Sequence, residues 1–326
     1  MVRLSVCLAA LVAAISPAAA FDCGKAATQV EKAICADPDL KAKDDEMSSL
    51  YADVRRLSTE AERKMLARSQ KKWIAEREAN CPQSGVGVAQ CIRSMTDDRI
   101  VLFAGKPSGG PGVEGRIIPV FIVQEGTEQV YDLDITMLKF AKASSPGQKR
   151  FNMIAEDMVA RIKTGRHGED TMGRIWAMEE AMTLNYLSPR LASVMFSSWY
   201  DLGGAHGNGA SSNFNFSMET GRDYTIDDFF SEESAAKLMA RCKAQIIAEK
   251  KERFGSEPYD PEVDSFLKDD TIAEHVATMS SWNFSDTAAS IVFNAYAIGS
   301  YAEGPYDCTL PLSELKAVAL KGAPLP

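Results

Sequence analysis

The chain has 326 residues, a formal net charge of −9 at pH 7 and 45% hydrophobic residues. This apolar content is typical of a folded globular protein and argues against intrinsic disorder. Residues 21–105 are balanced in charge, whereas residues 106–326 hold twenty-one basic and thirty-one acidic side chains. A negative field repels phosphates, so we expect no nucleic-acid binding. The acidity serves either solubility or the attraction of a basic partner.

Residues 1–20 have the pattern of a secretory signal peptide. Arg3 precedes an apolar run over residues 8–15, and Pro17 precedes three alanines that end at Ala20. A run of about a dozen apolar residues is too short to cross a bilayer, and no later segment is long and apolar enough. We therefore expect cleavage near Ala20 and a mature protein that is periplasmic or secreted, without membrane insertion.

The mature chain would keep an even number of cysteines, and in an exported protein that predicts disulfide bonds. The six cysteines are Cys23, Cys35, Cys81, Cys91, Cys242 and Cys308. The last two lie far apart in the sequence. We expect them to form one bridge between a helix and a late strand.

The N-terminal module, residues 21–103, is predicted to contain two helices. The first follows Asp37, a good N-cap residue. The second follows Ser58 or Thr59, with Glu62 placed for a capping box. A short link between two helices makes them antiparallel neighbours, so the sequence predicts a helical hairpin.

The hairpin leaves the disulfide connectivity of this module open. It would place Cys35 beside Cys81 and leave Cys23 to reach Cys91. The alternative, Cys23 with Cys35 and Cys81 with Cys91, closes two short loops. Sequence does not choose among the three connectivities, although the hairpin slightly favours the first. Either way, each bridge would stabilise the module by roughly 2–4 kcal/mol.

Two charged side chains lie on the apolar faces of these helices. Asp44 and Arg77 would meet in the hairpin as a partly buried ion pair, which is costly to break by removing one partner. Gln70 and Trp73 share the face of Arg77. We interpret these side chains as hairpin packing rather than as a ligand site.

The same residues resemble a known family. Tyr51, the string Gln70-x-x-Trp73-x-x-x-Arg77-x-x-x-Cys81 and the other three cysteines of residues 21–103 look like the N-terminal domain of LprI-type lysozyme inhibitors. The resemblance implies the fold strongly and lysozyme inhibition more weakly. The chain departs from the family pattern by lacking a lipidation cysteine.

Residues 104–116 are rich in glycine and proline and predict a linker. Strand-like and helix-like runs follow over residues 117–322. Strands are expected at 117–123, 130–141, 182–187, 191–202, 214–218, 291–296 and 309–312, and helices at 151–163, 234–253 and 272–279. A hairpin turn is expected at 219–222, leading to Tyr224. The fold class is thus multidomain, with a disulfide-stapled all-α helical hairpin module and then an α+β region with a mainly antiparallel sheet.

The second region resembles another family. Residues 201–208, 213–216, 225–230 and 301–305 look like the extracellular domains of RsiV-type anti-sigma receptors and PdaC-type peptidoglycan deacetylases. The resemblance spans about residues 115–320, and in the RsiV case this architecture binds lysozyme. We find neither an anti-sigma segment nor a deacetylase domain, so neither signalling nor deacetylation carries over.

The sharpest local feature is His206 within a glycine-rich stretch, residues 203–209. Such a histidine could be a general base or a metal ligand, or it could anchor the loop. We favour the anchor, because no nucleophile or ligand of recognisable spacing accompanies it. His167 and His275 lie far away, and no cluster has zinc spacing. We therefore expect no catalytic residue, no cofactor and no metal.

Two modules that each resemble lysozyme-binding proteins predict a non-enzymatic binding protein, an inhibitor of lysozyme or a related muramidase. The alternatives are an envelope protein that binds peptidoglycan fragments without inhibition, and a hydrolase that uses His206 with a nearby carboxylate. Loops are the expected contact surface, with Tyr301 and Tyr306 as aromatic anchors. The predicted partner-binding residues are Gly204, His206, Asn208, Tyr301, Glu303 and Tyr306.

Overall fold

The computed structural model describes residues 22–162, 174–255 and 259–326. The predicted signal peptide and His167 lie outside these residues. The described residues divide into two compact units, those of 22–56 with 74–103 and those of 57–73 with 104–326. None of the helices in the described residues is long and apolar enough to span a membrane.

The N-terminal region contains four α-helices, two more than predicted. They are α1 (Gln29–Ala36), α2 (Pro38–Leu57), α3 (Glu60–Asn80) and α4 (Val88–Ala104). The predicted cap Asp37 accepts from two amides at the start of α2, and Thr59 with Glu62 closes the start of α3. The missed helix α1 begins with its own capping box, Thr28 and Glu31, a pattern readable in the sequence.

The extra helices explain why the disulfide pairing favoured above is wrong. The bridges are Cys23–Cys35 and Cys81–Cys91, with sequence separations of 12 and 10. Cys23 lies in a turn just before α1 and Cys35 near the end of that helix, while Cys81 follows α3 and Cys91 lies near the start of α4. Each bridge therefore links a helix to the segment just before it and does not span the hairpin.

The buried ion pair of this region is present as predicted. Arg77 Nη1 lies 3.3 Å from Asp44 Oδ1, and both side chains are less than one-tenth exposed. Tyr51 packs edge-on against Phe103, with ring centroids 5.9 Å apart. Both contacts join residues distant in sequence and so fix how α2, α3 and α4 pack.

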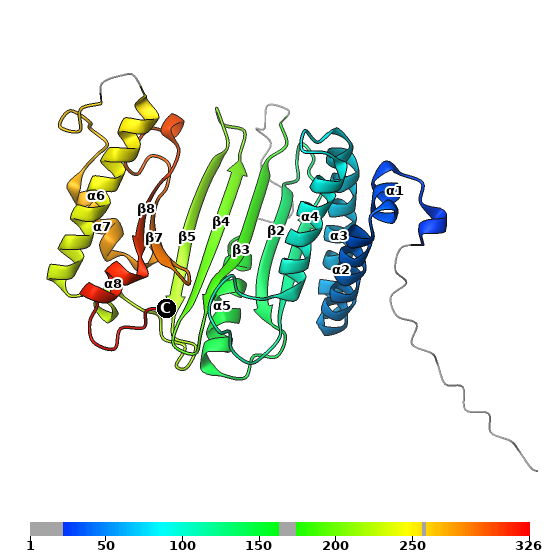
Figure 1. The fold of residues 1–326 in the computed structure, drawn as a ribbon, viewed down its shortest axis with the longest axis horizontal. Coiled ribbons are helices and arrows are strands. Elements are labelled where there is room, and N and C mark those ends of the chain that lie inside the picture. The colour runs from blue at the N-terminus through cyan, green and yellow to red at the C-terminus, as the bar shows by residue number, and fades with distance from the viewer. Residues whose placement is uncertain (1–21, 163–173, 256–258) are drawn as a thin grey trace, which may run out of the picture. The chain divides into compact units, whose positions relative to one another are not determined.

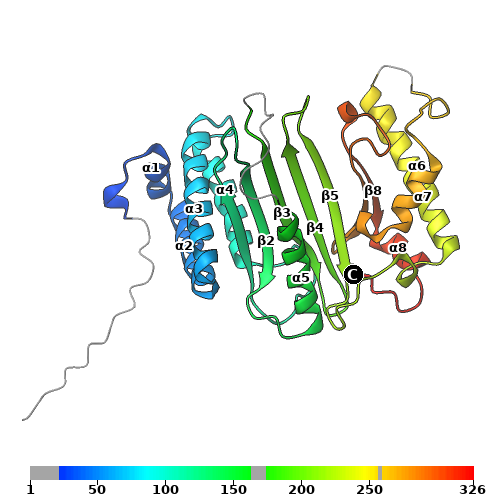
Figure 2. The ribbon, with the colours of Figure 1, turned by 180° about the vertical axis from the view of Figure 1, so that it is seen from behind.

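The second region begins with a five-stranded sheet in the order β1-β2-β3-β4-β5 (Figure 1). The strands are β1 (Ile117–Gln124), β2 (Asp132–Phe140), β3 (Ala177–Leu187), β4 (Ala192–Asp201) and β5 (Asn208–Phe216). Only β2 and β3 pair in parallel. The helix α5 (Pro146–Arg161) lies between these two strands in sequence and covers one face of the sheet (Figure 2). Its Phe151 packs against Phe140 with centroids 5.2 Å apart.

A three-stranded antiparallel sheet, β6-β7-β8, follows. Its elements are β6 (Trp282–Phe284), β7 (Ala288–Phe293) and β8 (Tyr306–Pro311), with helices α6 (Glu232–Phe254), α7 (Asp269–Ala277) and α8 (Leu312–Val318). The helices α6 and α7 lie on the side of this sheet away from β5 (Figure 1). Mainly antiparallel sheets accompanied by helices confirm the predicted α+β region.

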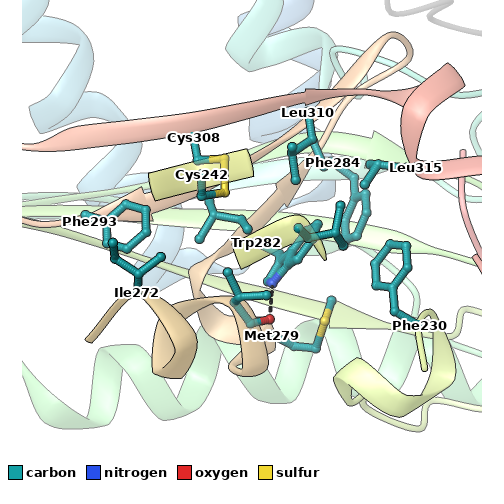
Figure 3. Packing of buried hydrophobic residues seen from close by; sticks show 14 of the residues in the cluster. Phe230, Cys242, Ile272, Met279, Trp282, Phe284, Phe293, Cys308, Leu310 and Leu315 are labelled. Atoms are coloured by element: carbon teal, nitrogen blue, oxygen red, sulfur yellow. Dashed lines mark hydrogen bonds between the residues drawn. A yellow bond between two sulfur atoms is a disulfide. The ribbon is translucent and has the colours of Figure 1, made fainter. Parts of the chain in front are cut away.

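The core of this part is strongly aromatic (Figure 3). Trp282 and Phe284 are fully buried, and the indole Nε1 of Trp282 donates to the carbonyl of Val276 at 2.9 Å. The bridge Cys242–Cys308 joins α6 to β8, as predicted for these two cysteines.

The bounds of several predicted strands differ. The strand placed at 214–218 spans Asn208–Phe216, so the last two residues of the glycine-rich stretch belong to β5. The strands placed at 291–296 and 309–312 are β7 and β8, and each begins and ends earlier than predicted. Tyr224 lies outside the strands, and a single antiparallel bridge, Phe216 with Asp223, remains of the expected hairpin. Gly221, with φ of 74°, turns the chain there.

Three strand residues are held by side-chain amides in a repeated arrangement that we call amide clasps. In each, the amide oxygen accepts from the N–H of a strand residue and the amide nitrogen donates to the C=O of the same residue. The clasps are Asn152 on Phe140 (2.8 and 3.0 Å), Asn294 on Ser211 (2.8 and 2.9 Å) and Gln245 on Thr309 (3.1 and 2.9 Å). Ser211 and Thr309 lie on the edge strands β5 and β8, so two clasps occupy backbone groups that another strand would otherwise pair with.

The predicted linker is tied to the strands beside it. Ser108 N–H donates to Leu184 O at 2.9 Å, and Gly112 N–H donates to Leu187 O at 2.8 Å. Gly110 N–H donates to the Asp286 carboxylate at 2.8 Å. The segment therefore follows the end of β3.

Candidate binding site

The glycine-rich stretch forms the connection between β4 and β5. Asp201, the nearest carboxylate to His206 in sequence, accepts from the N–H of Gly203 at 2.9 Å. Arg174 donates to the carbonyls of Gly203 and Gly204. Gly203 has φ of 78°, a conformation that favours glycine. Asp201 and Arg174 thus brace the turn.

His206 is anchored beside this turn by an aromatic cluster. Its ring stacks on Tyr301, with centroids 3.8 Å apart and an interplanar angle of 18°. Its Nδ1 lies 2.8 Å from the carbonyl oxygen of Gly207, which also accepts from the Tyr301 hydroxyl at 2.6 Å. Because a carbonyl only accepts, Nδ1 carries the proton. In the neutral ring Nε2 is then an acceptor, 3.4 Å from the Tyr296 hydroxyl.

Tyr296 shows that this cluster is held under strain. Its φ is 71°, which is unfavourable for any residue but glycine, and its side chain is 55% exposed. Residues held in such backbone conformations cluster at functional sites. Tyr296 was not recognised from the sequence, because it was assigned to a strand predicted at 291–296, whereas β7 ends at Phe293.

The structure brings four of the six predicted partner-binding residues to one place. Gly204, His206 and Asn208 lie on the β4–β5 connection or at its end, and Tyr301 reaches the same connection from the segment before β8. The other two lie elsewhere: Tyr306 is buried, and the half-buried Glu303 pairs with Lys250.

Tyr306 and Glu303 support the loop and are poor candidates for direct contact. Tyr306 is 1% exposed, and its hydroxyl donates to Glu303 Oε2 at 2.9 Å. Burial, and then this hydrogen bond, raises the pKa of Tyr306. The prediction of Tyr306 as an exposed anchor is therefore wrong, since alternation along β8 turns it into the core.

A buried lysine fixes Glu303. Lys250 of α6 is 1% exposed, and its Nζ lies 2.8 Å from Asp264 and 2.9 Å from Glu303. Burial alone would raise the pKa of Glu303, but hydrogen bonds from Lys250, the Ser300 amide and Tyr306 hold it below its usual range. The loop that carries Tyr301 is thus pinned to α6.

A groove of about 670 Å³ opens between the two sheets. One wall is the face of β4 and β5 that carries Ser197, Trp199, Gly209 and Ser211. These residues lie opposite one another in register, so they share a face. Trp199 is 39% exposed and packs on Gly207, where a Cβ atom would come within 2.5 Å of its ring.

The opposite wall comes from β6, β7 and β8. Ser290 and Val292 of β7 and Asn294 just after it line the groove, and Asp307 lies opposite Val292. Burial, with Glu249 near, raises the pKa of Asp307. Asn283 Oδ1 is buried and has no hydrogen-bond partner among the described residues. Sequence reasoning missed this wall because its residues are ordinary strand residues.

The arrangement suits binding more than hydrolysis. The hydrogen bonds of His206 go to a carbonyl and a tyrosine hydroxyl, neither of which would activate water. Within residues 22–162, 174–255 and 259–326, no group of three His, Cys, Asp or Glu side chains is placed to hold a metal ion.

Comparison with protein families gives two matches. Residues 22–101 match the family described as lysozyme inhibitor LprI, and residues 227–313 match a family described as a protein of unknown function, DUF3298. The chain thus contains an LprI domain and a DUF3298 domain. LprI is a family of inhibitors and not of enzymes. Comparison with curated proteins gives no significant match.

Two solved structures are similar to the chain. A DUF3298 family member from Bacteroides fragilis NCTC 9343 is 15% identical, with a TM-score of 0.47, over 66% of this chain and 96% of that one. A DUF3298 family protein from Pseudomonas aeruginosa PAO1 is 16% identical, with a TM-score of 0.39, over 65% and 95%.

Proposed function

We propose that the chain is an exported binding protein that inhibits lysozyme or a related muramidase. The observation that carries this proposal is the LprI match over residues 22–101. The net negative charge of residues 106–326 supports it, because a basic enzyme would be steered toward that region. Export to the periplasm or beyond, with cleavage near Ala20, is part of the proposal and accords with three disulfides.

We also propose the finer relationship of the second region to the extracellular domains of RsiV-type and PdaC-type proteins. The supporting observation is the position of the DUF3298 match, residues 227–313, inside the region that carries the resemblance. We keep residues 104–116 as the boundary between the two modules.

Inhibition of this kind needs a preformed surface, since ordering a flexible one would consume binding energy. The LprI module has two disulfides and the buried pair of Asp44 with Arg77. The loop of Tyr301 is likewise pinned by Lys250. We propose Gly204, His206, Asn208 and Tyr301 as partner-contacting residues on the second region.

The test is lysis of cell walls by lysozymes of several types in the presence of the mature chain, together with calorimetric measurement of the complex. We expect slower lysis and a complex that weakens as salt increases, because exposed charges are screened. Tyr301→Ala should weaken the complex. The matched control is Tyr200→Ala, an exposed tyrosine that lies outside the His206 cluster.

Unchanged lysis and no detectable complex would contradict the proposal. If the chain then sediments with purified cell wall, the alternative function is supported, namely an envelope protein that binds peptidoglycan fragments without inhibiting an enzyme.

A further inference from the structure

The groove between the two sheets is lined by both hydrogen-bonding and aromatic side chains. Its walls are two β-faces on which serine hydroxyls and asparagine amides lie among apolar side chains, and among the described residues Asp307 is the one charged residue that lines it. A ligand rich in hydroxyl groups would hydrogen-bond to both walls.

Two aromatic residues contribute to the lining of this groove. Trp199 and Tyr301 both line it, and Trp199 leaves 39% of its surface exposed. The face of an aromatic ring is negative and attracts the weakly positive C–H groups of a flat apolar ligand face. Hexoses with equatorial substituents present such C–H faces on their rings and hydroxyl groups around the edge.

An extended peptide is a poorer occupant. A peptide would add to the open edge of β5, but the Asn294 clasp already engages the N–H and C=O of Ser211 in the groove. A polyanion is disfavoured as well, because Asp307 supplies a negative charge and none of the described lining residues carries a positive one.

We propose that this groove binds a neutral hexose oligosaccharide. The volume of about 670 Å³ is within the ~300–1,000 Å³ of small-molecule sites. Trp199 would stack on a sugar ring, and the serine hydroxyls and Asp307 would bind its hydroxyl groups. Asn283 Oδ1, buried and without a partner among the described residues, would accept a hydrogen bond from the ligand. The proposal does not depend on lysozyme inhibition.

The experiment titrates the full mature chain with two tetrasaccharides in a calorimeter. One is β-1,4-linked N-acetylglucosamine and the other is cellotetraose, which has the same linkage without the acetamido groups. We expect binding of one or both. Binding of the first alone assigns recognition to the acetamido group, and equal binding assigns it to the sugar ring.

Two variants locate the site. Trp199→Ala should weaken binding roughly tenfold or more. Gly209→Val should block the groove without straining the strand, since the nearest atom to its Cβ would be at 3.7 Å and β-branched residues suit strands. The matched control is Tyr200→Ala, next along β4 and 37% exposed but on the opposite face.

Absence of binding to both sugars overturns the proposal, and so does binding that neither Trp199→Ala nor Gly209→Val weakens. The lysis assay of the proposed function is a separate measurement. If the chain inhibits lysozyme but binds neither sugar, only the proposed saccharide site is refuted.

Discussion

The helical N-terminal region and the second region are stabilised by different kinds of interaction. The first uses two disulfides that close short segments and one buried ion pair, Asp44 with Arg77. The second uses a broad aromatic core and one disulfide that spans 66 residues. Small modules bury too little apolar surface to be stable on packing alone, so they rely on covalent and ionic constraints.

The largest effect should come from breaking the ion pair. Asp44→Ala leaves the Arg77 guanidinium buried without its carboxylate, and we expect a loss of about 3–5 kcal/mol in the free energy of unfolding. Chemical denaturation followed by circular dichroism measures it. Lys64→Ala, which removes an exposed pair with Glu60, is the control and should cost less than about 0.5 kcal/mol. Equal losses would show that burial of the first pair is unimportant.

The second largest loss of stability should come from removing a disulfide, and it should differ between the two regions. A longer closed loop constrains the unfolded chain more, so replacing Cys242 and Cys308 by alanine should cost about 4 kcal/mol. The same change at Cys23 and Cys35, separated by 12 residues, should cost about 3 kcal/mol. Thermal unfolding of the two double variants gives the comparison, and a reversed order would argue against the loop-length explanation.

The amide clasp should have a smaller effect. Asn294→Ala leaves the N–H and C=O of Ser211 without their partner, at a cost of about 1–2 kcal/mol. Hydrogen exchange of the Ser211 amide should accelerate, while exchange at Phe140, which Asn152 holds, should be unchanged. Unaltered exchange at Ser211 would mean that the clasp does not protect the edge.

The smallest effect should be acid sensitivity of the second region. The pKa of Glu303 is lowered in the folded state, so its stabilising contribution is complete above its unfolded value of 4.5 and is lost as pH falls through the folded value. Stability should therefore fall below about pH 4.5. Glu303→Gln should be less stable near pH 7 and flatter in its pH profile. An equally steep profile in this variant would assign the acid lability to other groups.

The sequence predicted what depends on local pattern. Helix caps such as Thr59 with Glu62, strands of branched residues and the pairing of Cys242 with Cys308 were all readable, because neighbours in the chain or an isolated pair determine them. Even the contact of Asp44 with Arg77 followed from spacing and an antiparallel hairpin.

The candidate site could be predicted only in part. His206 drew notice through its glycines, but its partner Tyr301 lies on a separate loop and the stacking depends on Lys250. The groove was not predictable, because serines on a strand look like any solvent-facing positions. The prediction of Tyr306 as an anchor was wrong because successive side chains of a strand face opposite sides of the sheet. A shift of one residue decides which of them face inward.

The amide clasps carry a chemical liability. An amide both donates and accepts, whereas the carboxylate that spontaneous deamidation leaves behind only accepts. At Asn294 the new negative charge would face the carbonyl oxygen of Ser211, 2.9 Å from the present amide nitrogen. Slow hydrolysis of this one side chain would therefore, with age, loosen the strand that forms a wall of the groove.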